Sequence, residues 1–388
     1  MKSFNCISPL SDPKCRSCLC SLFATLTLIC GVYFFGNALL GKDYFKVAST
    51  LGLEGNNTKE NIHLNKCNEK CMPVGTEALP KGIVTKTSNL EMLPLWGPVL
   101  EDKKSDQTKN LLAVAVGVKQ KSLVNKIVKK FLADDFVVML FHYDGVLNEW
   151  NDLEWIERVI RVSAKNQTKW WFAKRFLHPD IVAKYEYIFI WDEDLGVEDF
   201  HPNRYLSIVK EEGLEISQPS LDPNKSEVHH HITARWNRSR VHRRYYKYRG
   251  GGRCYQNSTS PPCVGWVEMM APVFSRAAWR CAWYMIQNEL IHAWGLDMQL
   301  GYCAQGDRAK KVGVVDEEYI VHLGLPTLGG LSDKNKASSV AYKFGKRSAV
   351  RERSYAEMMI FKNRWNKAVK EDECWVDPYK QPAKWKIN

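Results

Sequence analysis

The stretch YEYIFIWDED (residues 185–194) joins an almost uninterrupted apolar run to a cluster of acids. The apolar run is typical of a strand that is buried on both faces of a sheet. Asp192 and Asp194 stand two residues apart, so in an extended backbone their carboxylates point to the same side, with Cα atoms roughly 6–7 Å apart. Two converging carboxylates favour a divalent cation. The alternative is an acidic turn that stabilises the start of a following helix.

The segments before this stretch predict the rest of a sheet. NLLAVAVGV (110–118) and FVVMLFHYDG (136–145) have the composition of two further buried strands, and apolar residues at helical spacing predict a helix over 121–132. A second helical segment is expected around 152–164. This order predicts an α/β fold with a mostly parallel sheet flanked by helices. Because such sheets bind ligands at the carboxyl ends of their strands, Asp144 is expected close to the two acids.

Composition and missing motifs exclude several functions. The chain has 388 residues, a net charge of +12 and 14 tryptophans, so an anionic partner is favoured. No repeat, zinc-finger or RNA-recognition pattern is present, and nucleic acid is therefore not expected as a partner. Neither a GxGxxG sequence after the first strand nor a Walker A sequence is present, which argues against dinucleotide-binding and P-loop enzymes.

The amino-terminal region predicts a membrane anchor. Residues 18–40 contain no charged side chain, and as a helix they would span roughly 35 Å, enough to cross a hydrocarbon core of about 30 Å. Three basic residues precede this segment against one acid, which by the positive-inside rule keeps residues 1–17 in the cytosol. A type II signal anchor is therefore expected. A cleaved signal peptide is the alternative, although its apolar region is normally shorter.

The remaining chain is expected in the lumen of the secretory pathway. Residues 41–108 lack periodicity and predict a stem, 109–370 predict the catalytic domain, and 371–388 predict a tail. Five N-glycosylation sequons begin at Asn56, Asn166, Asn224, Asn237 and Asn257. The seven cysteines beyond the anchor are an odd number, which allows a disulfide-linked homodimer. Cys67–Cys71 and Cys254–Cys263 are candidate local bridges, although spacing does not fix connectivity.

Five segments carry a resemblance to a known family: FHYDG, NQTKWWFAKRFLHPD, WDEDLGVEDF, EISQP and HHHITAR. Over about residues 95–367 they resemble a plant family catalogued as a domain of unknown function, whose members are often labelled "lysine-ketoglutarate reductase trans-splicing related". That label predicts a dinucleotide fingerprint, which the chain lacks. The sheet, the paired acids and the anchor also resemble a glycosyltransferase of the GT-A type, which implies a GT-A-like catalytic domain.

The GT-A resemblance implies a metal site and a base. Asp192 and Asp194 would bind the metal and, through it, the diphosphate of a nucleotide-sugar, with His322 as the third ligand. Carboxylates suit Mn²⁺ or Mg²⁺, and one imidazole favours Mn²⁺. Asp297, expected to open a later helix, or Glu268 in VGWVEMM would activate the acceptor hydroxyl as general base. Each has a structural alternative: a helix-start acid for Asp297 and a packing role for His322.

Four residues are further expected at the donor: Asp144, Gly265, Lys174 and Arg175, the last two as phosphate contacts. The sequence thus predicts a metal-dependent glycosyltransferase of the Golgi membrane, with the catalytic domain in the lumen and a glycan or cell-wall polysaccharide as acceptor. The alternative is a non-catalytic GT-A-like protein of the secretory pathway that binds a glycan or a nucleotide.

Overall fold

The computed structural model describes residues 72–87, 109–247, 254–325 and 340–379, with side chains from 349 onward in the last range. The expected cytosolic tail, anchor and Cys67–Cys71 bridge lie outside these residues. Within the described ranges, no helix is both long enough and apolar enough to span a membrane.

The sheet is built from nine strands of the described chain, in the order β3-β2-β1-β4-β8-β6-β9-β5, with β7 also paired to β9. The strand bounds are β1 Lys109–Val116, β2 Val137–His142, β3 Ile160–Ser163, β4 Tyr185–Trp191, β5 Leu195–Gly196, β6 Ile216–Leu221, β7 Val241–His242, β8 Val273–Ser275 and β9 Val312–His322.

Strand pairing makes the sheet mostly parallel, as predicted. β3, β2, β1 and β4 pair in parallel, β8 runs antiparallel between β4 and β6, and β6 pairs in parallel with β9. β3, β2, β1, β4, β6 and β9 therefore run in one direction. Their carboxyl ends lie along one edge of the sheet, where α/β proteins place their ligands.

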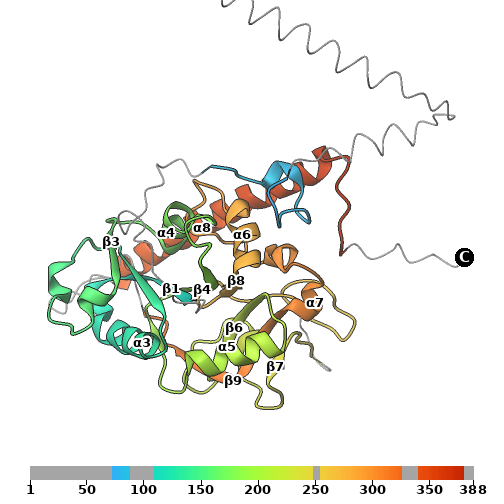
Figure 1. Cartoon of the computed structure of the whole chain (residues 1–388). Helices are drawn as coiled ribbons and strands as arrows, with labels where there is room; N and C mark the ends of the chain where they lie inside the picture. The colour runs from blue at the N-terminus through green and yellow to red at the C-terminus, as the bar shows by residue number, and fades with distance from the viewer. Residues whose placement is uncertain (1–71, 88–108, 248–253, 326–339, 380–388) are drawn as a thin grey trace, which may run out of the picture. The chain divides into compact units, whose positions relative to one another are not determined.

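Helices cover both faces of the sheet (Figure 1). α3 (Lys121–Ala133) and α5 (Pro202–Glu211) pack on one face, and α4 (Lys169–Phe176) and α6 (Arg276–Met285) on the other, where α8 (Val340–Glu371) joins the same apolar core. The short α7 (Arg308–Lys311) precedes β9. The 3₁₀ helices are η1 Lys81–Ile83, η2 Val118–Gln120, η3 Asn148–Trp150, η4 Ile156–Arg158, η5 His231–Thr233 and η6 Leu300–Cys303.

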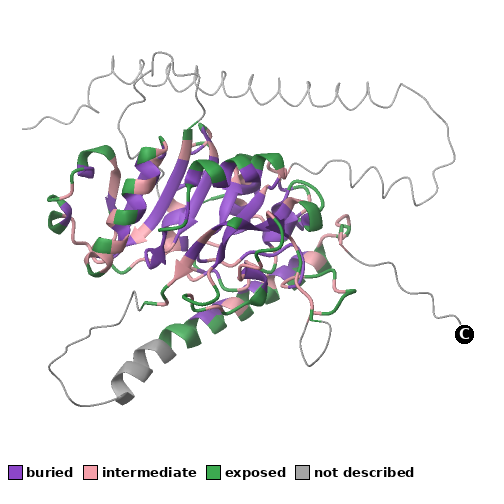
Figure 2. Cartoon of the chain, turned by 90° about the horizontal axis from the view of Figure 1, so that it is seen from below, coloured by how far each residue is buried: buried purple, intermediate pink, exposed green. Residues whose placement is uncertain are grey.

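The alternation of side chains along β1 explains the two cores. Leu111 and Ala113 pack with α4 and α6, whereas Leu112 and Val114 pack with α3 and α5. Successive residues of a strand point to opposite faces, so a strand that is covered on both sides must be apolar throughout. Figure 2 shows the result, with buried strands between helices whose outer surfaces are exposed.

The helix predicted around 152–164 is wrong. This region contains a short turn of 3₁₀ helix, η4, followed by the edge strand β3, which pairs with β2 through Ile160 opposite Met139. The two β-branched residues at 160 and 162 occupy alternate positions, and β-branched side chains pack well on a pleated sheet. A pairing partner distant in sequence decided the outcome, which local apolar spacing could not reveal.

The predicted boundaries at 108/109 and 370/371 also need correction. Leu79 and Ile83 are both 1% exposed, so residues 72–87, expected in the stem, pack into the folded body. Thr85 N–H donates to Tyr284 O at 2.7 Å. Beyond α8, Trp375 Nε1 donates to Ala78 O at 2.9 Å. The two flanking segments are thus part of the same folded unit, next to α6 and α8 (Figure 1).

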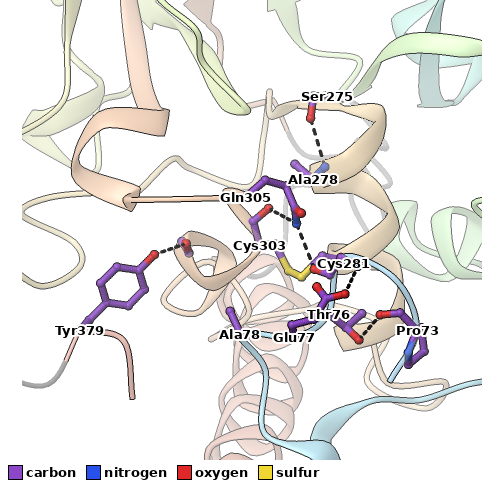
Figure 3. The surroundings of a disulfide bond; sticks show 12 residues. Pro73, Thr76, Glu77, Ala78, Ser275, Ala278, Cys281, Cys303, Gln305 and Tyr379 are labelled. Atoms are coloured by element: carbon purple, nitrogen blue, oxygen red, sulfur yellow. Dashed lines mark hydrogen bonds between the residues drawn. A yellow bond between two sulfur atoms is a disulfide. The ribbon is translucent and has the colours of Figure 1, made fainter. Parts of the chain in front are cut away.

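Disulfides link the loops around this unit. The predicted Cys254–Cys263 bridge is confirmed, and a second bridge joins Cys281 of α6 to Cys303 of η6 (Figure 3). Cys374 is also disulfide-bonded, so every cysteine among the described residues is in a disulfide. The disulfide-linked homodimer therefore has no free cysteine to use within the described ranges and stays a prediction.

Candidate active site at the carboxyl edge of the sheet

Three consecutive acids after β4 have three different sets of partners. Asp192, the most exposed of them, pairs with Lys169. Glu193 is 1% exposed and turns back toward the ends of β1 and β2. Asp194 is 4% exposed and faces the end of β9. The carboxyl edge of the sheet therefore holds a fixed acidic loop rather than a helix cap, because no helix begins directly after these residues.

Asp194 and His322, the two residues expected as ligands of one metal ion, lie side by side. Asp194 Oδ2 is 3.6 Å from His322 Nε2 and accepts a hydrogen bond from the Leu325 N–H at 2.8 Å. Burial, and then the nearby charge of Asp192, raise the pKa of the Asp194 carboxyl. His322 Nδ1 is 3.1 Å from Glu227 O, an acceptor, which favours a proton on Nδ1 and leaves Nε2 directed at Asp194.

Lys169, at the start of α4, is a site residue that the sequence did not reveal. Its ammonium lies 2.7 Å from Asp192 Oδ1 and donates to the carbonyl oxygens of Met269 at 2.6 Å and Met270 at 3.2 Å. The Asp192 N–H in turn donates to Met270 O at 2.8 Å. Asp192 is thus held by Lys169 and by the loop that precedes β8. Both contacts join residues that are more than twenty positions apart in the sequence, so no local pattern reveals them.

Glu193 fixes the acidic loop to the neighbouring strands. Its Oε2 accepts from the Gly117 N–H at 2.6 Å, and its Oε1 accepts from the Tyr143 hydroxyl. Burial raises the pKa of Glu193 to about 8. Gly117 leaves room for this arrangement, since a Cβ there would lie 2.4 Å from the Tyr143 hydroxyl oxygen. Glu193 is therefore a positioning residue, a role that the sequence did not predict.

Glu268 enters the site from the loop between β7 and β8. The charges of His322, Asp297, Asp192 and Lys169 all act on its carboxyl, and burial, the largest cause, raises the pKa of Glu268 to about 7. Its backbone N–H donates to Gln218 Oε1 at 2.5 Å. Its carboxylate oxygen Oε2 is buried and has no hydrogen-bond partner among the described residues. A buried, unpaired oxygen of this kind is available to a ligand.

Asp297 is close to this group but is held differently. It lies in a turn before η6, so the prediction that it opens a helix is wrong. Trp266 Nε1 donates to Asp297 Oδ2 at 3.2 Å, and backbone N–H groups including that of Met298 also bond to the carboxylate. Burial, the largest cause, raises the pKa of Asp297. Its carboxylate is therefore largely satisfied by the protein itself.

The four residues predicted to contact the sugar-nucleotide donor have contacts within the protein itself. Asp144 follows β2, and its carboxylate accepts from the Val118 N–H at 2.7 Å and from the Val146 N–H at 2.9 Å. Gly265 has φ +65°, and a Cβ there would lie 2.7 Å from Arg308 Cγ, so this glycine makes room for packing.

Lys174 and Arg175 are not placed to bind phosphate at this edge. The Lys174 ammonium is buried against Trp283, whose carbonyl oxygen it meets at 2.9 Å, and it also donates to Thr85 O at 3.2 Å. Burial lowers the pKa of Lys174 to about 7. Arg175 lies against the rings of Trp171 and Phe176. Both side chains serve the packing of α4, which composition alone does not distinguish from phosphate binding.

The side chains at this edge fit a divalent cation in part. In the described parts of the chain, no three His, Cys, Asp or Glu side chains are gathered as a ready metal site. Asp194 Oδ2 and His322 Nε2 have the spacing of neighbouring ligands of one ion. The charge of His322 also acts on Glu268, whose Oε2 is unpaired among the described residues. Asp192 is the exception, because Lys169 holds it.

Crystal structures of one bacterial protein resemble 55% of this chain. The crystal structure of S. aureus TarS 1–349 is 11% identical with a TM-score of 0.35, and the match covers 55% of this chain and 59% of that chain. The crystal structure of S. aureus TarS is 11% identical with a TM-score of 0.33, covering 55% and 36%. The chain thus spans less than two thirds of either structure.

No curated protein sequence matches the chain, and neither the matching family description nor the titles of the two TarS structures carry the lysine-ketoglutarate reductase label. One family model matches residues 70–371, well over half of the chain, under the description "Protein of unknown function (DUF707)". The chain therefore belongs to the DUF707 family.

Proposed function

We propose that the protein is a metal-dependent glycosyltransferase that moves a sugar from a nucleotide-sugar to a glycan or cell-wall polysaccharide in the Golgi lumen. One observation carries this proposal. Four carboxylates (Asp192, Asp194, Glu268 and Asp297) gather at the carboxyl edge of the sheet with one imidazole and one ammonium. Such an excess of negative charge at low exposure favours a cation, and a nucleotide diphosphate needs one as well.

The residues divide into donor and acceptor groups. Asp194 and His322 would hold Mn²⁺ or Mg²⁺, joined by Asp192 once it leaves Lys169. A bound divalent cation supplies neutralisation of the charge that develops on the diphosphate leaving group. Glu268 is favoured over Asp297 as the base that takes the proton of the acceptor hydroxyl. Glu268 has a free buried oxygen, whereas Trp266 and backbone N–H groups already occupy the Asp297 carboxylate.

A thermal-stability screen tests the proposal. The protein is heated with a panel of nucleotide-sugars, with and without Mn²⁺, beside the Asp192→Asn/Asp194→Asn variant. A donor at a hundred times its dissociation constant stabilises by about 2.7 kcal/mol. We expect a shift with one class of donor that needs Mn²⁺ and is absent from the variant. Asp199→Asn, a change at an exposed acid just beyond the motif, is the matched control and should keep the shift.

The screen also separates the alternative functions. A donor shift that persists without Mn²⁺ and survives the double substitution would contradict metal dependence and favour a nucleotide-binding protein without transferase activity. The absence of a shift with every donor would contradict the donor site itself. Where a donor binds, release of free nucleotide in the presence of plant glycans distinguishes an enzyme from a binding protein.

A further inference from the structure

All three ammonium hydrogens of Lys169 have acceptors. These are Asp192 Oδ1, Met269 O and Met270 O, at 2.7, 2.6 and 3.2 Å. An ammonium has three donors, so this set is complete. The side chain is only 9% exposed. Lys169 is thus built into the acidic site as its resident cation.

The same contacts explain why the predicted metal ligands are not assembled. Asp194 faces His322, but Asp192 turns away to Lys169, although the two acids stand two residues apart on one loop. The backbone strengthens this arrangement, since the Asp192 N–H donates to Met270 O at 2.8 Å. If Asp192 bound a divalent cation together with Asp194 while it stayed paired with the Lys169 ammonium, the two positive charges would repel each other. This repulsion would weaken the binding of the cation.

We propose that Lys169 is a positioning residue that competes with the divalent cation for Asp192. This inference rests on the proposed metal site and adds its regulation. With Lys169 paired, the cation has only Asp194 and His322 as ligands, and it binds weakly. When Asp192 joins them, the Lys169 ammonium keeps its two carbonyl acceptors and has one hydrogen free, which the anionic phosphates of the nucleotide-sugar could accept. Donor binding and tight cation binding are therefore coupled through this side chain.

Calorimetric titration of Mn²⁺ into the full-length protein, without donor, tests the competition. Lys169→Met removes the charge but keeps a long apolar side chain, and we expect it to bind Mn²⁺ at least tenfold more tightly than the wild type. Lys169→Arg keeps the charge and should show no such gain. Lys126→Met is the matched control, because Lys126 forms an exposed ion pair with Glu198 at 3.0 Å rather than with Asp192 or Asp194. Its Mn²⁺ affinity should equal that of the wild type.

Two results would overturn the inference. Equal or weaker Mn²⁺ binding by a folded Lys169→Met variant, with measurable binding by the wild type, would refute the competition while leaving the proposed metal site intact. Absence of Mn²⁺ binding by both proteins would refute the metal site and the competition together.

A second measurement avoids substitution altogether, in case Lys169→Met fails to fold. The unmodified protein is labelled with an amine-reactive reagent, and the labelled lysines are identified by mass spectrometry with and without Mn²⁺. Mn²⁺ should increase the labelling of Lys169 severalfold and leave that of Lys126 unchanged. Unchanged labelling at a saturating Mn²⁺ concentration would contradict the release of Lys169.

Discussion

At the scale of single residues, Glu268 makes the sharpest statement about catalysis. A general base must be ionised, and burial raises the pKa of Glu268 to about 7 from its ordinary 4.5. Transferase activity should therefore rise between about pH 6 and pH 8, and Glu268→Gln should lower kcat by 10²-fold or more, in line with typical general-base contributions. Rates measured with the donor identified by the thermal screen check both expectations. An acid limb that persists unchanged in the variant would assign the base to another residue.

The same residue predicts a cost in stability. A raised carboxyl pKa means that folding favours the protonated form, so the ionisation cost grows as pH rises from about 4.5 to 7 and remains above it. Glu268→Gln should therefore stabilise the protein at pH 8 by up to about 3 kcal/mol and have little effect at pH 4. Urea unfolding at the two pH values measures the difference. A variant that is equally stable or less stable at pH 8 would show that the carboxylate has a partner in the folded protein.

Several residues that the sequence predicted for the site are neighbours in the structure. Asp194 and His322 lie 3.6 Å apart, and the charges of His322, Asp297 and Asp192 act on Glu268. Their roles as metal ligands and as base stay predictions. Lys169 and Glu193 were missed. Their partners are brought close only by the tertiary fold. In the sequence, a lysine in the first turn of α4 cannot be distinguished from an exposed lysine on a helix surface. Lys174 was misplaced for the same reason, since only the fold shows that its ammonium is buried against Trp283.

At the scale of elements, α8 packs against the folded body through buried side chains that include Trp365. Trp365 is 7% exposed and its ring lies 5.0 Å from that of Tyr302, with Trp375 on another side at 6.3 Å. Trp365→Ala should destabilise the protein by about 3–5 kcal/mol, because a buried indole leaves a large cavity. Ile360→Ala on the exposed side of the same helix should cost less than about 1 kcal/mol. Similar losses for the two variants would mean that α8 is not docked through Trp365.

Elements with a strong local pattern were predicted and those without one were not. The buried strands β1, β2 and β4 and the helix α3 appear where continuous or helically spaced apolar residues predicted them. The helix prediction for 152–164 was wrong because an edge strand needs only a few alternating apolar residues and a neighbouring strand to pair with. Residues 72–87 and 372–379 were predicted as stem and tail because their apolar residues are sparse. These residues become buried only against parts of the chain that are far away in the sequence.

At the scale of the whole molecule, the Cys281–Cys303 bridge ties α6 to the turn that also contacts the beginning of the body. In Figure 3 it lies beside Thr76, Glu77 and Ala78, and Gln305 Nε2 donates to Gly75 O at 3.0 Å. The bridge closes a loop with a sequence separation of 22 residues, for which the chain-entropy relation gives about 3 kcal/mol. Cys281→Ala/Cys303→Ala should therefore lower the free energy of unfolding by about this amount. Denaturant melts of the variant and of the wild type measure it; equal midpoints would contradict a stabilising role.

The contact between the first and last parts of the folded body sets an order of events during synthesis. Trp375 Nε1 reaches Ala78 O across 297 residues, and the Lys81 N–H reaches Asp372 Oδ2 across 291. The ribosome adds residues one at a time, so a nascent chain that has already formed its central sheet still exposes the apolar side chains of Leu79 and Ile83 until α8 has emerged. Folding of the body is thus completed only when α8 and the residues up to Trp375 have been made. A chain released before that point exposes the apolar side chains of residues 79–83, which chaperones and proteases can recognise.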